Sequence, residues 1–135
     1  MPGVERLRAV VLDTHAWVWM CAGDKRARAL VNFSGRAIVS AISVWEVAML
    51  AEKERLILKP NVDRWIEANL EPPVELEPIH PSICIESCRL PDFHGDPADR
   101  LIVATALTLG LPLITADVKI HEWNYRNPLI QVVQI

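Results

Sequence analysis

Short apolar segments alternate along the chain with longer segments in which apolar and polar residues mix at helical spacing. Residues 9–12 and 37–39 are continuous apolar runs, residues 112–115 are nearly so, and residues 74–77 alternate between apolar and charged. Continuous apolar runs are typical of strands buried on both faces of a parallel sheet. A last β-rich run covers residues 129–135. Strands separated by helices predict an α/β fold with a mainly parallel sheet.

The segments between the strands predict helices with recognisable ends. Residues 97–109 predict a helix with Asp96 as N-cap and Gly110 as its stop, because aspartate followed by proline is a common helix start. Ser43 and Glu46 match a capping box, so we expect the helix of that region to begin there and continue to about residue 55. Residues 118–128 are expected to be irregular. Further helices are expected at residues 16–20, 24–33, 62–70 and 81–89.

Length and composition restrict the kind of protein. The chain has 135 residues, 51% of them hydrophobic, which predicts one domain over residues 1–135 with a substantial core. No apolar run is long enough to span a membrane, and no signal peptide is recognisable. Three cysteines without a Cys-x-x-Cys pair argue against a disulfide framework, so we expect a reducing, cytoplasmic location. The net charge of −3 gives no overall basic surface, so binding of nucleic acid would need local cations or metal ions.

Acidic residues recur at the ends of the predicted strands. Asp13 follows the first strand, Glu46 lies in the first turn of the helix after the second, and Asp117 follows the fourth. Because the carboxyl ends of parallel strands share one edge of the sheet, these three acids are expected together where ligand sites collect. Asp99 lies in the first turn of a helix that follows a loop and a short helix, so this rule does not place it.

Carboxylates that converge on one point need a cation, since their mutual repulsion otherwise raises their pKa values. Oxygen ligands favour Mg²⁺ or Mn²⁺, and such ions activate water for attack at phosphorus. Taken singly, however, Asp13 and Asp117 are also explained as turn formers. Glu46 is also explained by the capping box, and Asp99 by the helix dipole. The residues alone therefore leave both interpretations open.

Four segments, in this order along the chain, resemble those of the PIN domain family. They are Val10-Val11-Leu12-Asp13-Thr14-His15, Val39-Ser40-Ala41-Ile42-Ser43-Val44-Trp45-Glu46, Asp96-Pro97-Ala98-Asp99-Arg100-Leu101-Ile102-Val103-Ala104-Thr105-Ala106 and Leu113-Ile114-Thr115-Ala116-Asp117. Within that family the chain is similar to the VapC-type ribonuclease toxins of prokaryotic toxin–antitoxin pairs.

The resemblance implies a three-layer α/β/α sandwich around the central parallel sheet. It also implies hydrolysis of RNA by metal-activated water, a cognate antitoxin as partner, and a homodimer. The Mg²⁺ or Mn²⁺ site would be formed by four acids, namely Asp13, Glu46, Asp99 and Asp117.

Five further residues near these acids are candidates for supporting roles. Thr14 and Thr115 match the hydroxyl positions beside the first and last acids, and both are expected to orient carboxylates. Asp96 is expected to fix the turn that presents the third acid. Arg100 is equally compatible with pairing to a carboxylate and with reaching an RNA phosphate. His15 either packs within the structure or contacts phosphate.

A zinc site is conceivable at His80, Cys84 and Cys88, which share one helix face, with His94 nearby. No paired Cys-x-x-Cys accompanies them, so we favour cysteines buried as small hydrophobic residues.

The tryptophans and one basic cluster each have two interpretations. Trp17, Trp45 and Trp65 lie in amphipathic helices and are expected in the core or at an interface, whereas stacking on bases is the alternative for all five tryptophans, Trp19 and Trp123 included. A basic cluster on an early helix is either a solvated face or a guide for RNA or for an acidic partner segment. It consists of Lys25, Arg26 and Arg28.

Two other functions were compared with the nuclease hypothesis. A catalytically silent RNA- or protein-binding PIN module is disfavoured by the complete set of acids. A phosphatase with Asp13 as nucleophile is also weaker, because the Asp-x-Asp expected of one such class is absent and Thr14-His15 follow instead.

Overall fold

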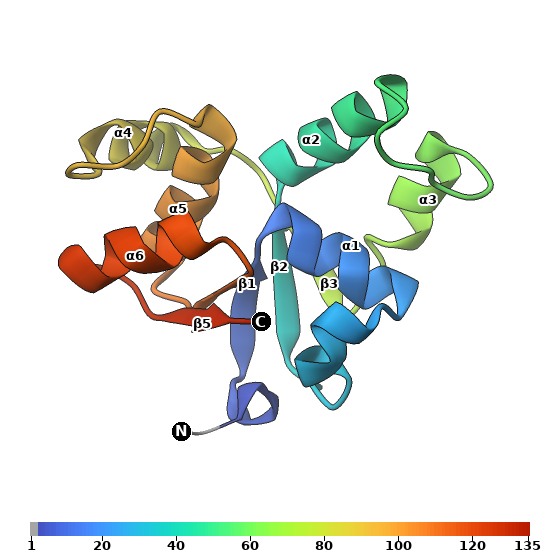
Figure 1. Cartoon of the computed structure of the whole chain (residues 1–135), viewed down its shortest axis with the longest axis horizontal. Coiled ribbons are helices and arrows are strands. Elements are labelled where there is room, and N and C mark those ends of the chain that lie inside the picture. Colours follow the sequence, from blue (N-terminus) through green and yellow to red (C-terminus); the bar gives the residue numbers. More distant parts are fainter. Residues whose placement is uncertain (1–2) are drawn as a thin grey trace.

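The computed structural model describes residues 3–135 and is built around one sheet of five parallel strands (Figure 1). The strands lie in the order β3-β2-β1-β4-β5, and Leu12 of β1 pairs with Val39 of β2 and with Ile114 of β4. The predicted parallel sheet is therefore confirmed. The strand bounds are β1 (Ala9–Leu12), β2 (Arg36–Ser40), β3 (Val74–Glu77), β4 (Leu113–Thr115) and β5 (Val132–Gln134).

Helices cover both faces of the sheet, which gives the expected three layers (Figure 1). Side chains of a strand alternate between its two faces, so neighbours such as Val10 and Val11 belong to different cores. One core packs against α1 (Thr14–Ala22), the 3₁₀ helix η2 (Lys25–Leu30), α2 (Ala41–Glu52) and α3 (Val62–Ala68). The other packs against α5 (Pro97–Leu109) and α6 (Val118–Arg126), and α4 (Pro81–Arg89) packs on α5. A short 3₁₀ helix, η1 (Val4–Arg6), precedes β1.

The strand order creates a crevice at the carboxyl edge of the sheet. From β1 the chain proceeds outward to β2 and β3 on one side, and then crosses over to β4 and β5 on the other. Connections that leave in opposite directions open a crevice between β1 and β4, where α/β proteins bind ligands. Asp13 directly follows β1, and Asp117 lies two residues after β4.

Local sequence signals set the ends of α5. The Asp96 side chain accepts hydrogen bonds from the backbone N–H groups of Ala98 (2.9 Å) and Asp99 (3.3 Å). Gly110 ends the helix at φ +66°, a left-handed conformation that glycine adopts without strain. The bounds predicted for this helix, for residues 81–89 and for residues 74–77 are confirmed.

Residues 118–128 were expected to be irregular, and that prediction is wrong. Residues 118–126 form α6, because the Asp117 side chain caps the helix by accepting from the N–H of Lys119 at 2.8 Å. Ile120 and Trp123, three residues apart, are both buried against the sheet. Only these two side chains of the segment are buried, which makes a weak periodic signal, and the cap at Asp117 sets where the helix begins.

The start of α2 also differs from the prediction. Ser40 is the N-cap and accepts from the N–H of Ile42 at 3.2 Å, so the helix begins at Ala41 and not at Ser43. It ends at Glu52, before residue 55. Ser43 is fully buried inside the helix, and its hydroxyl contacts another side chain instead of capping. The capping box of Ser43 and Glu46 is therefore absent.

Other side chains also depart from expectation. The predicted helix at 24–33 is the shorter 3₁₀ helix η2, which is kinked at Ala27. Cys84 and Cys88 are exposed, so they are not the buried hydrophobic residues that we favoured. Trp17 is buried as expected, but Trp45 is 57% exposed, so of its two expected settings, core and interface, only the interface remains a prediction. Among residues 3–135, no helix is long and apolar enough to cross a bilayer.

Candidate active site

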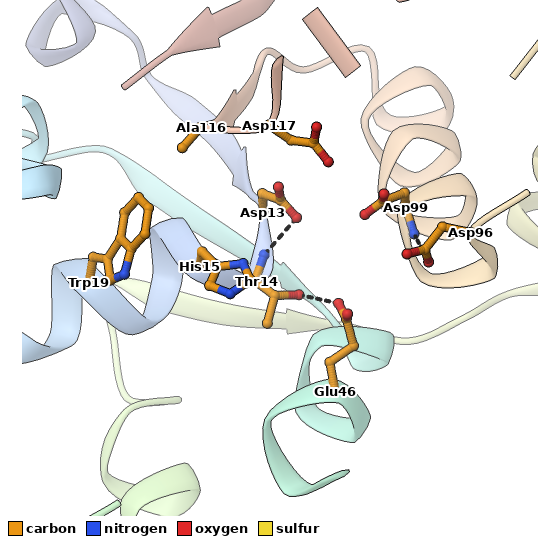
Figure 2. Close-up of a pocket in the computed structure, with 9 residues that line it drawn as sticks. All are labelled: Asp13, Thr14, His15, Trp19, Glu46, Asp96, Asp99, Ala116 and Asp117. Atoms are coloured by element: carbon orange, nitrogen blue, oxygen red, sulfur yellow. Dashed lines mark hydrogen bonds between the residues drawn. The ribbon is translucent and has the colours of Figure 1, made fainter. Parts of the chain in front are cut away.

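An open cleft of about 400 Å³ lies at the carboxyl edge of the sheet, above the crevice between β1 and β4 (Figure 2). All four predicted acids line it, although they come from four different elements or their ends. Its lining residues are Asp13, Thr14, His15, Trp19, Glu46, Asp96, Asp99, Ala116 and Asp117.

Asp13 is the most deeply placed acid, with 6% of its surface exposed. It is the N-cap of α1, and its Oδ1 accepts from the backbone N–H of Thr14 at 2.8 Å. Its Oδ2 accepts from the hydroxyl of Thr115 at 2.6 Å. Two donors on different elements therefore fix the orientation of this carboxylate.

Glu46 is held by a chain of hydroxyl groups that begins in the core. Thr14 donates its only hydroxyl proton to Glu46 Oε1 at 2.5 Å (Figure 2). The contact of 2.8 Å between the hydroxyls of Thr14 and Ser43 must then have Ser43 as donor. Thr14 thus binds Asp13 through its backbone and Glu46 through its side chain, and it ties the two acids together.

Asp99 lies in the first turn of α5 and faces the cleft opposite Asp13 (Figure 2). Its Oδ2 is 2.9 Å from Nε2 of His94, in the loop before the helix. That loop is fixed by Arg100, which donates to the backbone carbonyl of Phe93 at 2.9 Å, and by Trp123, whose ring meets Phe93 edge to face at 4.8 Å. The structure therefore supplies the placement of Asp99 that strand-edge reasoning did not.

Asp117 completes the group from the other side of the crevice. Its backbone N–H donates to the Thr115 hydroxyl at 3.0 Å, while that hydroxyl donates to Asp13. Its carboxylate caps α6 through Lys119. One buried threonine thus connects the acid after β1 with the acid after β4.

Burial and mutual repulsion disfavour the charged forms of these carboxyl groups. Burial raises the pKa of Asp13, although the hydrogen bonds from Thr115 and Thr14 oppose the shift. Burial also raises the pKa of Glu46, and the charge of Asp13 adds to the effect. The pKa of Asp99 rises from 3.8 to about 6, first because of burial and then because of nearby acids including Asp13 and Asp117. The site carries negative charge that calls for a compensating cation.

Comparison with known proteins identifies the family of the chain. The sequence of the chain matches the PIN domain family over residues 10–123, a span that contains all four acids. The chain belongs to the PIN domain family. It is 36% identical over 128 residues to Ribonuclease VapC22 of Mycobacterium tuberculosis, covering 91% of this chain and 98% of that protein.

Solved structures support the fold assignment of this PIN domain. It is similar to VapBC2 from Rickettsia felis bound to a DNA fragment from its promoter, with a TM-score of 0.71 and 15% identity over 93% of this chain and 98% of that one. It is also similar to VapBC-5 from Mycobacterium tuberculosis, with a TM-score of 0.66 and 18% identity over 96% of this chain and 100% of that one. At these identities the likeness concerns the fold.

The donor chemistry of the PIN domain site fits a hard divalent cation. Every acid in the cleft offers carboxylate oxygens, which Mg²⁺ and Mn²⁺ prefer. As they stand, no three His, Cys, Asp or Glu side chains of residues 3–135 meet in a finished metal-ligating group. Each acid is hydrogen-bonded to a protein donor, and each carboxylate keeps further lone pairs that could bind a cation.

The remaining predicted residues lie in or beside the cleft. Asp96 caps α5 at its rim, and His15 is exposed within it, with its ring 5.8 Å from that of Trp19. Arg100 donates to the backbone carbonyls of Ser87 (3.1 Å) and Phe93 rather than to an acid. It forms no ion pair within residues 3–135, which disfavours the carboxylate-pairing alternative.

Sequence reasoning missed two residues that touch the acids. His94 was considered only for zinc, yet it contacts Asp99. Ser43 was assigned to a cap, yet it supports Thr14. No local signal shows either contact, because both depend on how separate elements pack. At the residues considered for zinc, His80 pairs instead with Glu77 at 3.2 Å, and Cys84 and Cys88 are exposed.

Asp99 is expected to make the stability of the metal-free chain depend on pH. Because the pKa of Asp99 is raised to about 6, its protonated form is favoured in the folded state. The free energy of unfolding should therefore fall as pH rises from about 4 through about 6, and Asp99→Asn should reduce this loss. Urea denaturation in EDTA measures both, with Asp63→Asn on α3 as a control expected to behave like the unmodified chain. If the free energy of unfolding of Asp99→Asn falls with pH as steeply as that of the unmodified chain, the raised pKa does not belong to Asp99.

The second prediction concerns His94. Its contact with Asp99 is expected to orient that carboxylate, and loss of such a partner typically lowers metal affinity or activity about 10- to 100-fold. His94→Ala should show a decrease in this range for Mn²⁺ affinity, measured by calorimetry. His80→Ala is the matched control, because His80 pairs with Glu77 at 3.2 Å and lies outside the cleft. Equal affinities for both variants would mean that His94 has no such role.

Proposed function

We propose that this PIN domain is a Mg²⁺- or Mn²⁺-dependent endoribonuclease and the toxin of a VapBC-type toxin–antitoxin pair. The observation that carries the proposal is the convergence of Asp13, Glu46, Asp99 and Asp117 on one open cleft. The similarity to a protein named as a ribonuclease, over nearly the full length of both chains, supports the choice of RNA as substrate.

The four acids would hold the ion, and the surrounding donors would set their orientation. A bound divalent cation supplies Lewis acidity and an activated water for displacement at phosphorus. Thr115 and the Thr14 N–H fix Asp13, while the Thr14 hydroxyl fixes Glu46. The cleft is open to solvent, so a phosphodiester within a longer strand fits better than a small, enclosed substrate.

Cleavage of RNA with and without metal tests the proposal. A labelled RNA incubated with the chain should be cut in Mg²⁺ or Mn²⁺, left intact in EDTA, and cut again when excess Mg²⁺ is restored. Glu52→Gln, a change to an exposed acid at the end of α2, should cut like the unmodified chain. Cleavage that persists in EDTA would overturn the metal-dependent mechanism.

The toxin role and its partners need a separate test. The similar solved structures are VapBC or toxin–antitoxin complexes, which supports an antitoxin partner. We also propose a cytoplasmic location for the pair. Expression should arrest growth, and co-expression of the neighbouring open reading frame should relieve the arrest. The homodimer is also proposed, and light scattering of the purified chain tests it. Unimpaired growth on expression of an active nuclease would point to another role for the enzyme.

A further inference from the structure

A surface beside the catalytic cleft combines aromatic and basic side chains, and we call it the basic track. It is formed by His15 and Trp19 on α1 and by Lys25, Arg26 and Arg28 on η2. Its aromatic half belongs to the cleft itself, because both rings line the same hollow as the acids. Figure 2 shows them on the opposite side of Asp13 from Asp96 and Asp99.

Direct contacts join the two halves of the basic track. The guanidinium carbon of Arg26 lies 4.3 Å from the ring centre of Trp19, and the Trp19 ring lies 5.8 Å from that of His15. Arg26 is held in place by Asp24, which accepts from its Nη2 at 2.7 Å and from its Nε at 3.0 Å. An aromatic surface that leaves the acidic cleft therefore continues directly into a cationic one.

The positive charge of the basic track is not neutralised at two positions. Lys25 and Arg28 are exposed and form no ion pair within residues 3–135, whereas Arg26 is paired with Asp24. Together with Ala29 and Ile135 these basic residues line a shallow hollow of about 450 Å³. Free cations beside a cluster of acids are what a polyanionic strand needs in order to approach that cluster.

The opposite exit of the cleft has a different character. There Ile42, Trp45 and Met49 line an apolar hollow with Glu46 and Asp96 as its charged residues. That hollow has no cation in its lining to meet a phosphate. Charge therefore favours the basic track as the path of a nucleic acid, and stacking on Trp19 is independent of base identity.

We propose that single-stranded RNA runs along the basic track into the cleft, with a base against Trp19 and His15 and neighbouring phosphates on Lys25 and Arg28. The inference rests on the proposed ribonuclease function and names the surface by which that function takes its substrate. It assigns Lys25, Arg28 and Trp19 to affinity for the strand, and leaves bond cleavage to the acids.

Fluorescence anisotropy with a labelled single-stranded RNA of mixed sequence tests the basic track. The Asp13→Asn chain in Mg²⁺ serves as background, so that the RNA stays intact. Lys25→Gln/Arg28→Gln should weaken binding about tenfold and reduce the salt slope of log K by about 1.4, since each single-strand phosphate contact contributes about 0.7. Lys53→Gln/Arg55→Gln removes the same charge from the end of α2, where both residues are exposed, and should change neither quantity.

Tryptophan variants separate stacking from charge. Trp19→Ala should weaken binding about tenfold and Trp19→Phe much less, because stacking of one base contributes a factor of about 5 to 150. Trp45→Ala, which alters the apolar hollow, should bind like the background chain. Since Trp19 also packs against the core, a thermal melt accompanies these variants, and the charge pair gives an answer that does not depend on them.

Two results would overturn the inference. One is that Lys25→Gln/Arg28→Gln and Lys53→Gln/Arg55→Gln change RNA affinity equally, including the case in which neither changes it. The other is that Lys25→Gln/Arg28→Gln leaves RNA affinity unchanged but abolishes antitoxin capture, which would make the surface a protein interface. This binding test is independent of the cleavage test of the proposed function. A chain that cleaves RNA with metal but binds it independently of the basic track refutes only this inference. A chain that binds through the basic track but never cleaves refutes only the nuclease proposal.

Discussion

Asp13→Asn is expected to lower RNA cleavage by more than about 100-fold. Residues that only orient a metal ligand typically contribute about 10- to 100-fold, and removal of a ligand charge should exceed that range. Asn is also a good N-cap, so the backbone bond from Thr14 can persist and α1 should keep its start. The measurement is the rate of cleavage of a labelled RNA in Mg²⁺, relative to the unmodified chain.

The same variant should not be less stable without metal. Burial raises the pKa of Asp13, which means that the ionised carboxylate is disfavoured in the folded state. At neutral pH in EDTA, the uncharged amide should therefore unfold at the same or a higher urea concentration. Activity loss together with retained stability identifies a functional acid, whereas activity loss with early unfolding would mean that Asp13 serves mainly the fold.

Thr115→Val is expected to lower both stability and activity. The hydroxyl is fully buried, donates to Asp13 at 2.6 Å and accepts from the N–H of Asp117 at 3.0 Å. Valine has nearly the same shape but leaves both groups without this partner, which should reduce the free energy of unfolding by about 1–3 kcal/mol. Cleavage should fall about 10- to 100-fold, because Asp13 loses a group that orients it. Urea denaturation and cleavage assays measure the two effects.

Two variants control for the chemistry of that change. Thr115→Ser keeps the hydroxyl and should restore most of the activity. Thr105→Val removes another buried hydroxyl, which donates to the carbonyl of Leu101 within α5 at 2.7 Å and touches no acid. It should leave cleavage unchanged. Equal loss of activity in Thr105→Val and Thr115→Val would show that any buried threonine matters and that Thr115 has no special role.

The sequence predicted the parts of the fold that local signals determine. The helix 97–109 was placed correctly because an aspartate cap, a proline and a C-terminal glycine all agree. Local signals failed where two of them competed. Ser40 and Ser43 both precede apolar helical residues, and only the packing of Ser43 against Thr14 decides that Ser40 is the cap.

The sequence predicted which acids line the cleft but not which side chains hold them in place. Strand-edge reasoning brought Asp13, Glu46 and Asp117 together, since Asp13 and Asp117 follow strands and Glu46 lies on the helix after β2. Glu46 was expected in the first turn of that helix, but it lies in the second, because α2 begins at Ala41. Asp99 joined them only by family resemblance, and the structure now places it in the same cleft. Its contact with His94 depends on a loop conformation that Arg100 and the core fix through tertiary contacts, so no sequence pattern announces it.

The central claim is that acids from four elements form one divalent metal site. Titration of the metal-free chain with Mn²⁺, followed by electron paramagnetic resonance, tests it most directly through Asp99, the acid that strand order alone does not place. We expect saturable binding that Asp99→Asn and Asp13→Asn each weaken by at least about tenfold, while Asp63→Asn on α3 leaves it unchanged. Mn²⁺ binding by Asp99→Asn that is as tight as in the unmodified chain would mean that Asp99 does not belong to the metal site.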